Sequence, residues 1–231
     1  MKLNKKILCV AGVTLLLSST NLFAVEQSAK DILNKAYRYV GGMQKYAFTA
    51  VVSDENTEKP YKQTVSVKIN RPNQFRVETR GTVKNRTNYF NNGSFTMLDH
   101  DFNYYGQIET PKTIDAALDF LFDRFGINAP LSHLMYSDMD KRAKPKYVKY
   151  FGVKDVAGVS CDYIAFKNGS RTIHVWVEKG DKPLVKTYSI IDTTSRINTS
   201  IRWDENPNIS ESDFVFVAPK NTSKISVEPA N

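Results

Sequence analysis

The sequence predicts an α+β protein in which a strongly curved antiparallel β-sheet, an open half-barrel, wraps a lid of about three helices. Two observations lead to this fold class. Beyond residue 45, most segments alternate apolar and polar residues with a period of two and are separated by short turns, which is typical of an antiparallel meander. The stretches with helical spacing stand at the start and in the middle, and they do not alternate with strands, so a parallel α/β sheet is excluded.

The first half of the chain begins with a helix and continues with strands. Residues 29–40 carry apolar side chains at steps of three and four, with Ser28 as a candidate N-cap and Gly41 and Gly42 as the stop. From Lys45 the period changes to two, which predicts neighbouring strands joined by turns. We expect these strands at residues 45–52, 65–69, 75–79, 87–90, 95–98 and 102–108.

The middle of the chain contains the clearest helical pattern. Between Ile114 and Phe125 the apolar residues recur at steps of three and four, Thr113 can cap the start, and Gly126 follows the end. A second short helix is expected at residues 130–136, followed by a loop at 137–146. Further strands are then expected at residues 147–153, 159–166, 172–178, 184–191, 197–203 and 214–217.

The N-terminus has the layout of a cleavable secretory signal. Three lysines precede the uncharged run 7–17, and small and polar residues lead to Ala24, after which we expect cleavage. The run is shorter than the ~20 apolar residues that span a bilayer. The expected organisation is therefore a signal peptide at 1–24 and a single half-barrel domain at 25–231, located in the periplasm and not integral to the membrane.

Charge and cysteine content narrow the class further. Removing the three signal lysines lowers the formal charge from +8 to +5, which fits an anionic lipid or acidic surface and equally a plain solvated surface. Cys161 is the only cysteine after residue 24, so no internal disulfide can form, and its apolar surroundings predict a buried side chain.

Six segments resemble known families. Residues 69–78 (INRPNQFRVE) and 214–219 (FVFVAP) resemble a strand-turn-strand segment and the closing strand of the periplasmic lipoprotein carriers of the Lol system. Four other segments are more similar to an uncharacterised family of predicted periplasmic proteins related to those carriers: 103–105 (NYY), 113–121 (TIDAALDFL), 158–166 (GVSCDYIAF) and 175–183 (VWVEKGDKP). The resemblance implies a half-barrel with a hydrophobic hollow that holds acyl chains in relatives, and it implies no activity.

No pattern of catalytic, metal-binding or cofactor-binding residues stands out. His100, His133 and His174 lack a recognisable nucleophile setting, and the serines lack the small-residue elbow of acyl-transfer enzymes. Asp99 and Asp101 flank His100 in what we expect to be a surface turn. We therefore expect no catalytic residue, no metal and no cofactor, and export from the cytoplasm argues against a nucleic-acid partner. The basic cluster at 141–149 suits lipid phosphate, an acidic protein or a solvated loop.

The inward-facing apolar residues give the strongest indication of function. A carrier-like protein that shelters a lipid or lipoprotein acyl chain needs a hollow lined by apolar side chains, because each buried methylene contributes about 0.8 kcal/mol. A closed core would use the same residues, so an envelope interaction or sensor module with a closed cavity is the alternative, and an unrecognised hydrolase is a third hypothesis. Movement of the helix 113–125 would gate loading. The expected lipid-binding residues are Phe48, Val52, Val67, Ile69, Phe75, Val77, Phe95, Met97, Leu118, Leu121, Phe122 and Phe125.

Overall fold

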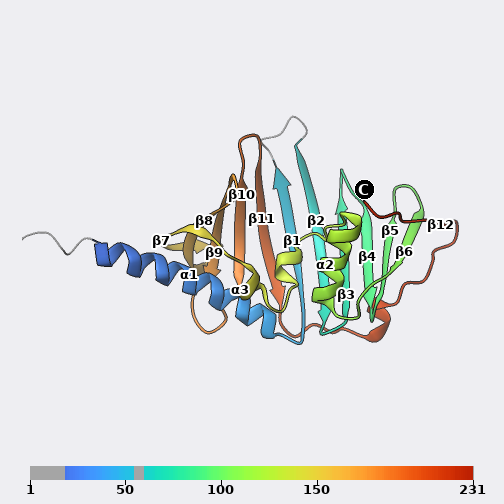
Figure 1. Ribbon diagram of the computed structural model, residues 1–231, viewed down its shortest axis with the longest axis horizontal. Coiled ribbons are helices and arrows are strands. Elements are labelled where there is room, and N and C mark those ends of the chain that lie inside the picture. The colour runs from blue at the N-terminus through green and yellow to red at the C-terminus, as the bar shows by residue number, and fades with distance from the viewer. Residues whose placement is uncertain (1–18, 55–59, 231) are drawn as a thin grey trace, which may run out of the picture.

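The strands of the protein form one continuous curved sheet. A computed structural model describes residues 19–54 and 60–230, and twelve strands in this part of the chain lie in the order β12-β6-β5-β4-β3-β2-β1-β11-β10-β9-β8-β7 (Figure 1). All neighbouring pairs are antiparallel except β12 and β6, which are parallel. The predicted curved antiparallel sheet with about three helices is confirmed.

Two meanders build this sheet. The first consists of β1 (Lys45–Asp54), β2 (Tyr61–Asn70), β3 (Gln74–Gly81), β4 (Arg86–Asn91), β5 (Ser94–Asp99) and β6 (Tyr104–Glu109). The second consists of β7 (Lys146–Val156), β8 (Val159–Asn168), β9 (Arg171–Glu178), β10 (Val185–Ile191) and β11 (Arg196–Asp204), and β12 (Ser223–Ile225) follows at the end of the chain. The helical elements are α1 (Ser19–Gly42), α2 (Ile114–Phe125), η1 (Ser132–Leu134), α3 (Met139–Arg142) and η2 (Glu211–Phe214).

Pairing between β1 and β11 joins the two meanders and dictates the path of the middle segment. Phe48 lies opposite Trp203 and Ala50 opposite Ile201, so the first and last long strands are neighbours at the centre of the sheet. Strands β6 and β7, consecutive along the chain, consequently lie ten strand spacings apart, or ~48 Å along a flat sheet. Residues 110–145 must therefore cross the width of the sheet, and they carry α2, η1 and α3 over the face that α1 also covers (Figure 1). We call this the inner face.

Local capping explains why α2 begins and ends where the sequence predicts. The Thr113 hydroxyl accepts a hydrogen bond from the Ala116 N–H at 3.4 Å. At the other end Gly126 adopts the left-handed conformation at φ 63°, and its N–H donates to the Phe122 carbonyl. The helix buries Leu118 and Leu121 toward the sheet, which stabilises the crossing segment against the first meander.

A partly buried polar network fixes the segment 110–145 on the inner face. The Arg71 guanidinium donates to the Tyr46 hydroxyl at 3.1 Å and lies 3.9 Å from the Asp115 carboxylate at the start of α2. The Tyr46 hydroxyl donates to the Leu134 carbonyl at 2.8 Å, and Asp115 accepts the Ser137 N–H at 3.1 Å. The start of α2 and the residues around η1 are thus attached to β1 and to the β2–β3 turn.

The end of the chain differs from the prediction. Residues 214–217 were expected to form the final strand, but Glu211–Phe214 form the 3₁₀-helix η2 and the last strand is Ser223–Ile225. The alternation that suggested a strand has another cause: Phe214 is buried, and Phe216 packs between Tyr89 and Tyr105 on the outer face at ring distances of 5.6 and 4.8 Å. These aromatic side chains attach an irregular segment to the sheet.

Two helical predictions also need correction. Helix α1, described from Ser19 onward, continues through Ser28, which therefore is not its N-cap. The expected loop 137–146 contains the short helix α3, whereas the expected helix 130–136 is reduced to the 3₁₀ turn η1. The predicted signal peptide lies largely outside the described residues, so its cleavage stays a prediction.

Candidate binding cavity

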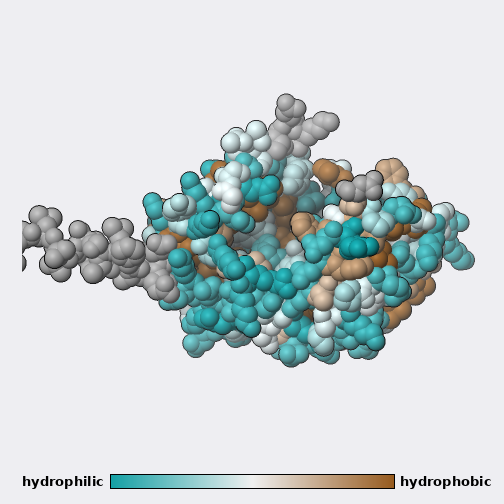
Figure 2. All heavy atoms as spheres, in the orientation of Figure 1, coloured by the Kyte–Doolittle hydropathy of each residue, from teal (hydrophilic) through white to brown (hydrophobic). Residues whose placement is uncertain are grey.

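The two halves of the inner face are covered differently. Helix α2 lies in front of β2, β3 and β4, while α1 and α3 lie in front of the second meander (Figure 1). Under α2 the aromatic rings pack directly: Phe75 lies 5.1 Å from Phe90 and 6.3 Å from Phe95 between ring centroids. Over β8–β10 the cover leaves a cavity of about 540 Å³. Figure 2 shows this face of the molecule hollowed, with hydrophobic atoms in the hollow.

The floor of the cavity is apolar because β8, β9 and β10 turn alternate side chains inward. On the neighbouring strands, Val175 pairs with Ile164 and Tyr188, and Ile173 pairs with Phe166 and Ile190. The strand registers therefore place apolar side chains side by side in successive rows across β8, β9 and β10. The floor consists of Phe166, Ile173, Val175, Val185, Tyr188 and Ile190.

The cover over this floor comes from two separate segments of the chain. Helix α1 contacts β7, β9, α3 and η1, and it contributes one aromatic side chain to the cavity. The remainder comes from the connection between α2 and β7. The covering residues are Tyr37, His133, Leu134, Met139, Ala143 and Pro145.

His133 is the titratable group of the cover. Its ring packs edge-on against Tyr188 at 5.2 Å between centroids, and among the described residues no hydrogen bond to the ring is present. Burial lowers the pKa of His133 to about 4, because the surrounding protein atoms disfavour the charged imidazolium. Burial likewise raises the pKa of Tyr188 to about 12. Both side chains are therefore neutral at pH 7, which keeps this part of the wall uncharged.

The rim of the cavity is polar and basic. Arg142 belongs to α3, Lys144 follows α3, and Arg171 opens β9. No acidic residue is among the side chains that line the cavity in the described part of the chain. The polar lining residues are Asn128, Ser132, Arg142, Lys144, Asn168 and Arg171.

The twelve residues that the sequence nominated for lipid contact lie elsewhere. None of them lines this cavity: most pack in the core between the first meander and α2. Phe48, Val67 and Phe95, for example, are at most 2% exposed. Periodicity identified a set that faces inward except at Phe122, but it could not distinguish a filled half of the sheet from a hollow one. Their role in lipid binding stays a prediction.

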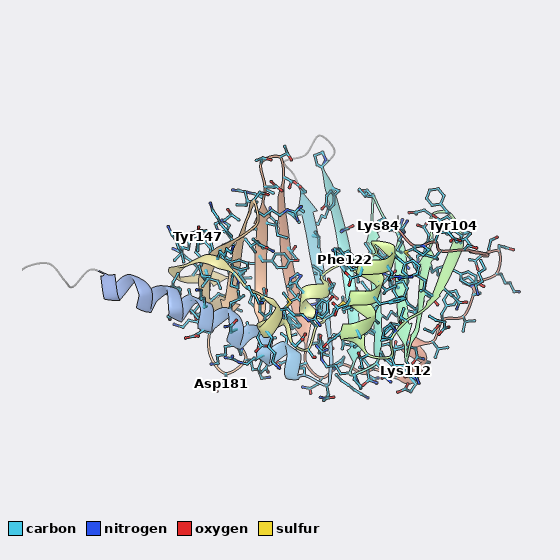
Figure 3. All side chains as sticks on the ribbon, viewed as in Figure 1. Lys84, Tyr104, Lys112, Phe122, Tyr147 and Asp181 are labelled. Atoms are coloured by element: carbon cyan, nitrogen blue, oxygen red, sulfur yellow. The ribbon has the colours of Figure 1, made fainter. Side chains whose placement is uncertain are left out.

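Phe122 departs from the expected pattern. Its side chain is 59% exposed on α2 (Figure 3), whereas its neighbour Leu121 is 1% exposed. The apolar stripe of α2 is wider than the surface that the sheet can cover, which leaves Phe122 in solvent. The residues of the cover were missed because they come from short segments with weak patterns, toward which only the basic cluster at 141–149 pointed. The floor strands were predicted, but periodicity did not show that their inward side chains border a cavity.

The remaining reactive side chains serve structural contacts. His100 contacts the Thr87 hydroxyl at 2.8 Å, and His174 contacts the Tyr163 hydroxyl at 2.6 Å. Asp99 ends β5, pairs with Arg86 at 2.7 Å and accepts backbone hydrogen bonds from the turn that follows. Cys161 is buried, as predicted. Within residues 19–54 and 60–230, no group of three or more His, Cys, Asp or Glu side chains is placed to hold a metal ion.

A family match covers most of the chain. Residues 29–228 match the model of a family described as "Predicted periplasmic protein (DUF2092)". The protein belongs to this family. The resemblance to an uncharacterised periplasmic family is thereby confirmed, and the family description agrees with the predicted periplasmic location. No curated protein matches the chain in sequence.

Solved structures share the fold. An uncharacterised conserved protein from Thermus thermophilus aligns with a TM-score of 0.54 at 12% identity, covering 87% of this chain and 99% of its own. LprF from Mycobacterium bovis aligns with a TM-score of 0.50 at 11% identity, covering 85% and 98%. A LolA superfamily protein from Nitrosomonas europaea also matches, with a TM-score of 0.40, 6% identity and coverage of 81% and 97%. The first two likenesses establish the fold and nothing about activity.

The helices give no sign of a membrane span. Among those in the described part of the chain, none combines the length and the apolar character that crossing a bilayer requires.

Proposed function

We propose that this periplasmic protein binds the acyl chain of a lipid or lipoprotein in the cavity over β8–β10, as a carrier-like protein that catalyses no reaction. The observation that carries the proposal is the cavity itself: about 540 Å³, with an apolar floor and a polar rim. This volume falls within the ~300–1,000 Å³ of typical small-molecule sites. The likeness to LprF and the Thermus protein supports the fold on which the proposal is built.

The free energy of transfer from water to the cavity favours an apolar ligand. Each methylene transferred from water to the cavity contributes about 0.8 kcal/mol, so a chain that occupies the floor gains several kcal/mol before any polar contact. The floor side chains have no hydrogen-bonding groups except the Tyr188 hydroxyl. The ligand enters through the polar rim of the cavity, and this route requires no movement of α2.

The direct test is native mass spectrometry of protein purified from the periplasm. We expect adducts with the mass of a lipid, released under denaturing conditions. A lipid-free mass that stays unchanged after incubation with phospholipid, fatty acid and lipopeptide would contradict the proposal.

A pair of variants on β9 assigns the site. Ile173→Trp places an indole on the cavity floor and should abolish the adduct by filling the space. Thr172→Trp places the same indole on the outer face of the same strand and should leave the adduct intact, because successive residues point to opposite faces. Circular dichroism and thermal unfolding check that both variants fold. Equal lipid binding by both variants would show that the cavity over β8–β10 is not the binding site.

One surface favours a second candidate function, binding of an envelope protein. Strand β7 is the last strand of the sheet, and three of its apolar side chains are exposed: Tyr147 at 71%, Phe151 at 47% and Val153 at 46%. Figure 3 shows Tyr147 at this end of the sheet. An unpaired edge strand with exposed apolar side chains suits strand addition by a partner. Crosslinking from residue 147 in cells would capture such a partner in lipid-free and lipid-loaded protein alike.

A further inference from the structure

The charge at the cavity mouth narrows the class of ligand. We infer that the cavity takes a single-chain amphiphile whose anionic head group is held by Lys144 and Arg171; the inference rests on the proposed function and specifies its ligand. Three cationic side chains line the rim: Arg142 and Lys144 come from α3 and the residues after it, and Arg171 comes from β9. Among the described side chains, no carboxylate lines the cavity with them.

The three cations are not equally available. Arg142 is already neutralised, because its guanidinium lies 2.9 Å from the Asp119 carboxylate and 2.5 Å from that of Asp138. Arg171 has one partner, Asp192 at 3.2 Å, and its side chain is 62% exposed. Lys144 forms no ion pair within the part of the chain that the structure describes, and its side chain is exposed. Lys144 and Arg171 are consequently the groups that can bind an incoming anion.

The surroundings reinforce this positive charge. Lys141 and Lys146 flank Arg142 and Lys144 along the chain, and Lys167 lies on β8 next to the β8–β9 turn that places Arg171. The sequence alone singled out the cluster at 141–149 without assigning it a ligand. The fold brings its central residues to the mouth of an apolar cavity, where an anion would be attracted and its hydrocarbon tail buried. Arg171 can also donate two parallel hydrogen bonds to a carboxylate or phosphate.

The volume limits the number of chains. At ~30 Å³ for each water-sized group, 540 Å³ accommodates on the order of 18 heavy atoms. A methylene, like a water molecule, is one heavy atom, so the cavity holds one acyl chain and not the two or three of a diacyl phospholipid or a triacylated lipoprotein. The matching ligands are a free fatty acid and a lysophospholipid with an anionic head group.

The test compares ligands that share one chain and differ in the head group. Binding is measured as displacement of the uncharged fluorophore N-phenyl-1-naphthylamine by myristate, myristoyl lysophosphatidylglycerol, myristoyl lysophosphatidylcholine and neutral monomyristoylglycerol, at low ionic strength. We expect the two anionic ligands to bind at least about tenfold more tightly than the other two, as charge-assisted hydrogen bonds imply. Inorganic phosphate should not displace the fluorophore, which separates head-group recognition from phosphate binding.

The double variant Lys144→Gln/Arg171→Gln should weaken binding of the anionic ligands about tenfold and leave binding of monomyristoylglycerol unchanged. The matched control Lys154→Gln/Arg202→Gln removes the same charge outside the cavity lining, from two exposed positions, and should keep the preference. Equal affinity for all four ligands, or equal loss in both double variants, would overturn the inference while leaving the cavity proposal in place. Failure of every ligand to displace the fluorophore would instead count against the cavity proposal itself. Tighter binding of diacyl phosphatidylglycerol than of its lyso form would overturn the single-chain assignment.

Discussion

Acidification should destabilise the protein through His133. Burial lowers the pKa of this side chain to about 4 in the folded state, against 6.5 for an unperturbed imidazole. The unfolded chain therefore takes up a proton near pH 6.5 that the folded chain does not accept until about pH 4. The contribution of neutral His133 to the free energy of unfolding is fully present above pH 6.5, and it is lost as the pH falls from 6.5 to about 4.

The magnitude follows from the two pKa values. Between pH 7.5 and pH 5 the folded state loses about 2 kcal/mol relative to the unfolded state, since the unfolded imidazole is almost fully protonated at pH 5 and the folded one is mostly neutral. The measurement is urea-induced unfolding at both pH values, followed by circular dichroism.

Two variants isolate the contribution of His133. His133→Gln removes the titration and keeps a polar side chain, and His133→Phe removes the titration and keeps an aromatic ring against Tyr188. Each variant should lose about 2 kcal/mol less than the wild type between the two pH values, because the other titratable groups are unchanged. If wild type and both variants show the same pH dependence, the placement of His133 in a desolvated site is wrong.

Two further predictions concern packing. A Cβ atom at Gly106 would lie 2.3 Å from the Val227 side chain. Gly106→Ala should therefore destabilise the protein by about 1–3 kcal/mol and make the C-terminal segment accessible to protease. The double variant Gly106→Ala/Val227→Ala removes the clash and should restore protection from protease. On α2, Leu121→Ala should cost about 2–5 kcal/mol in urea unfolding, whereas Phe122→Ala should change stability by less than about 0.5 kcal/mol because its ring is in solvent. Equal effects at the two α2 positions would contradict the orientation of the helix.

Local signals made several elements predictable. The capped helix α2 was identified to the residue, since Thr113 and Gly126 mark its ends by side-chain and backbone geometry alone. The turn between β4 and β5 also follows from local chemistry, because Asn92 and Gly93 both adopt positive φ, which Asn and Gly tolerate. At the end of the chain the same reasoning failed, as alternation at Phe214 and Phe216 reflects contacts with the outer face and not a strand.

The sequence by itself determined the strands of both meanders, the main helix and most of the inward-facing residues, because these depend on periodicity and capping within a few residues. Only the tertiary structure decided that β1 pairs with β11, which sends residues 110–145 across the whole sheet. That crossing segment fills the inner face with α2 on one side and leaves a cavity with Lys144 and Arg171 at its rim on the other. The physical reason is that a hollow results from how segments distant in sequence fit together, and no local pattern encodes the space left between them.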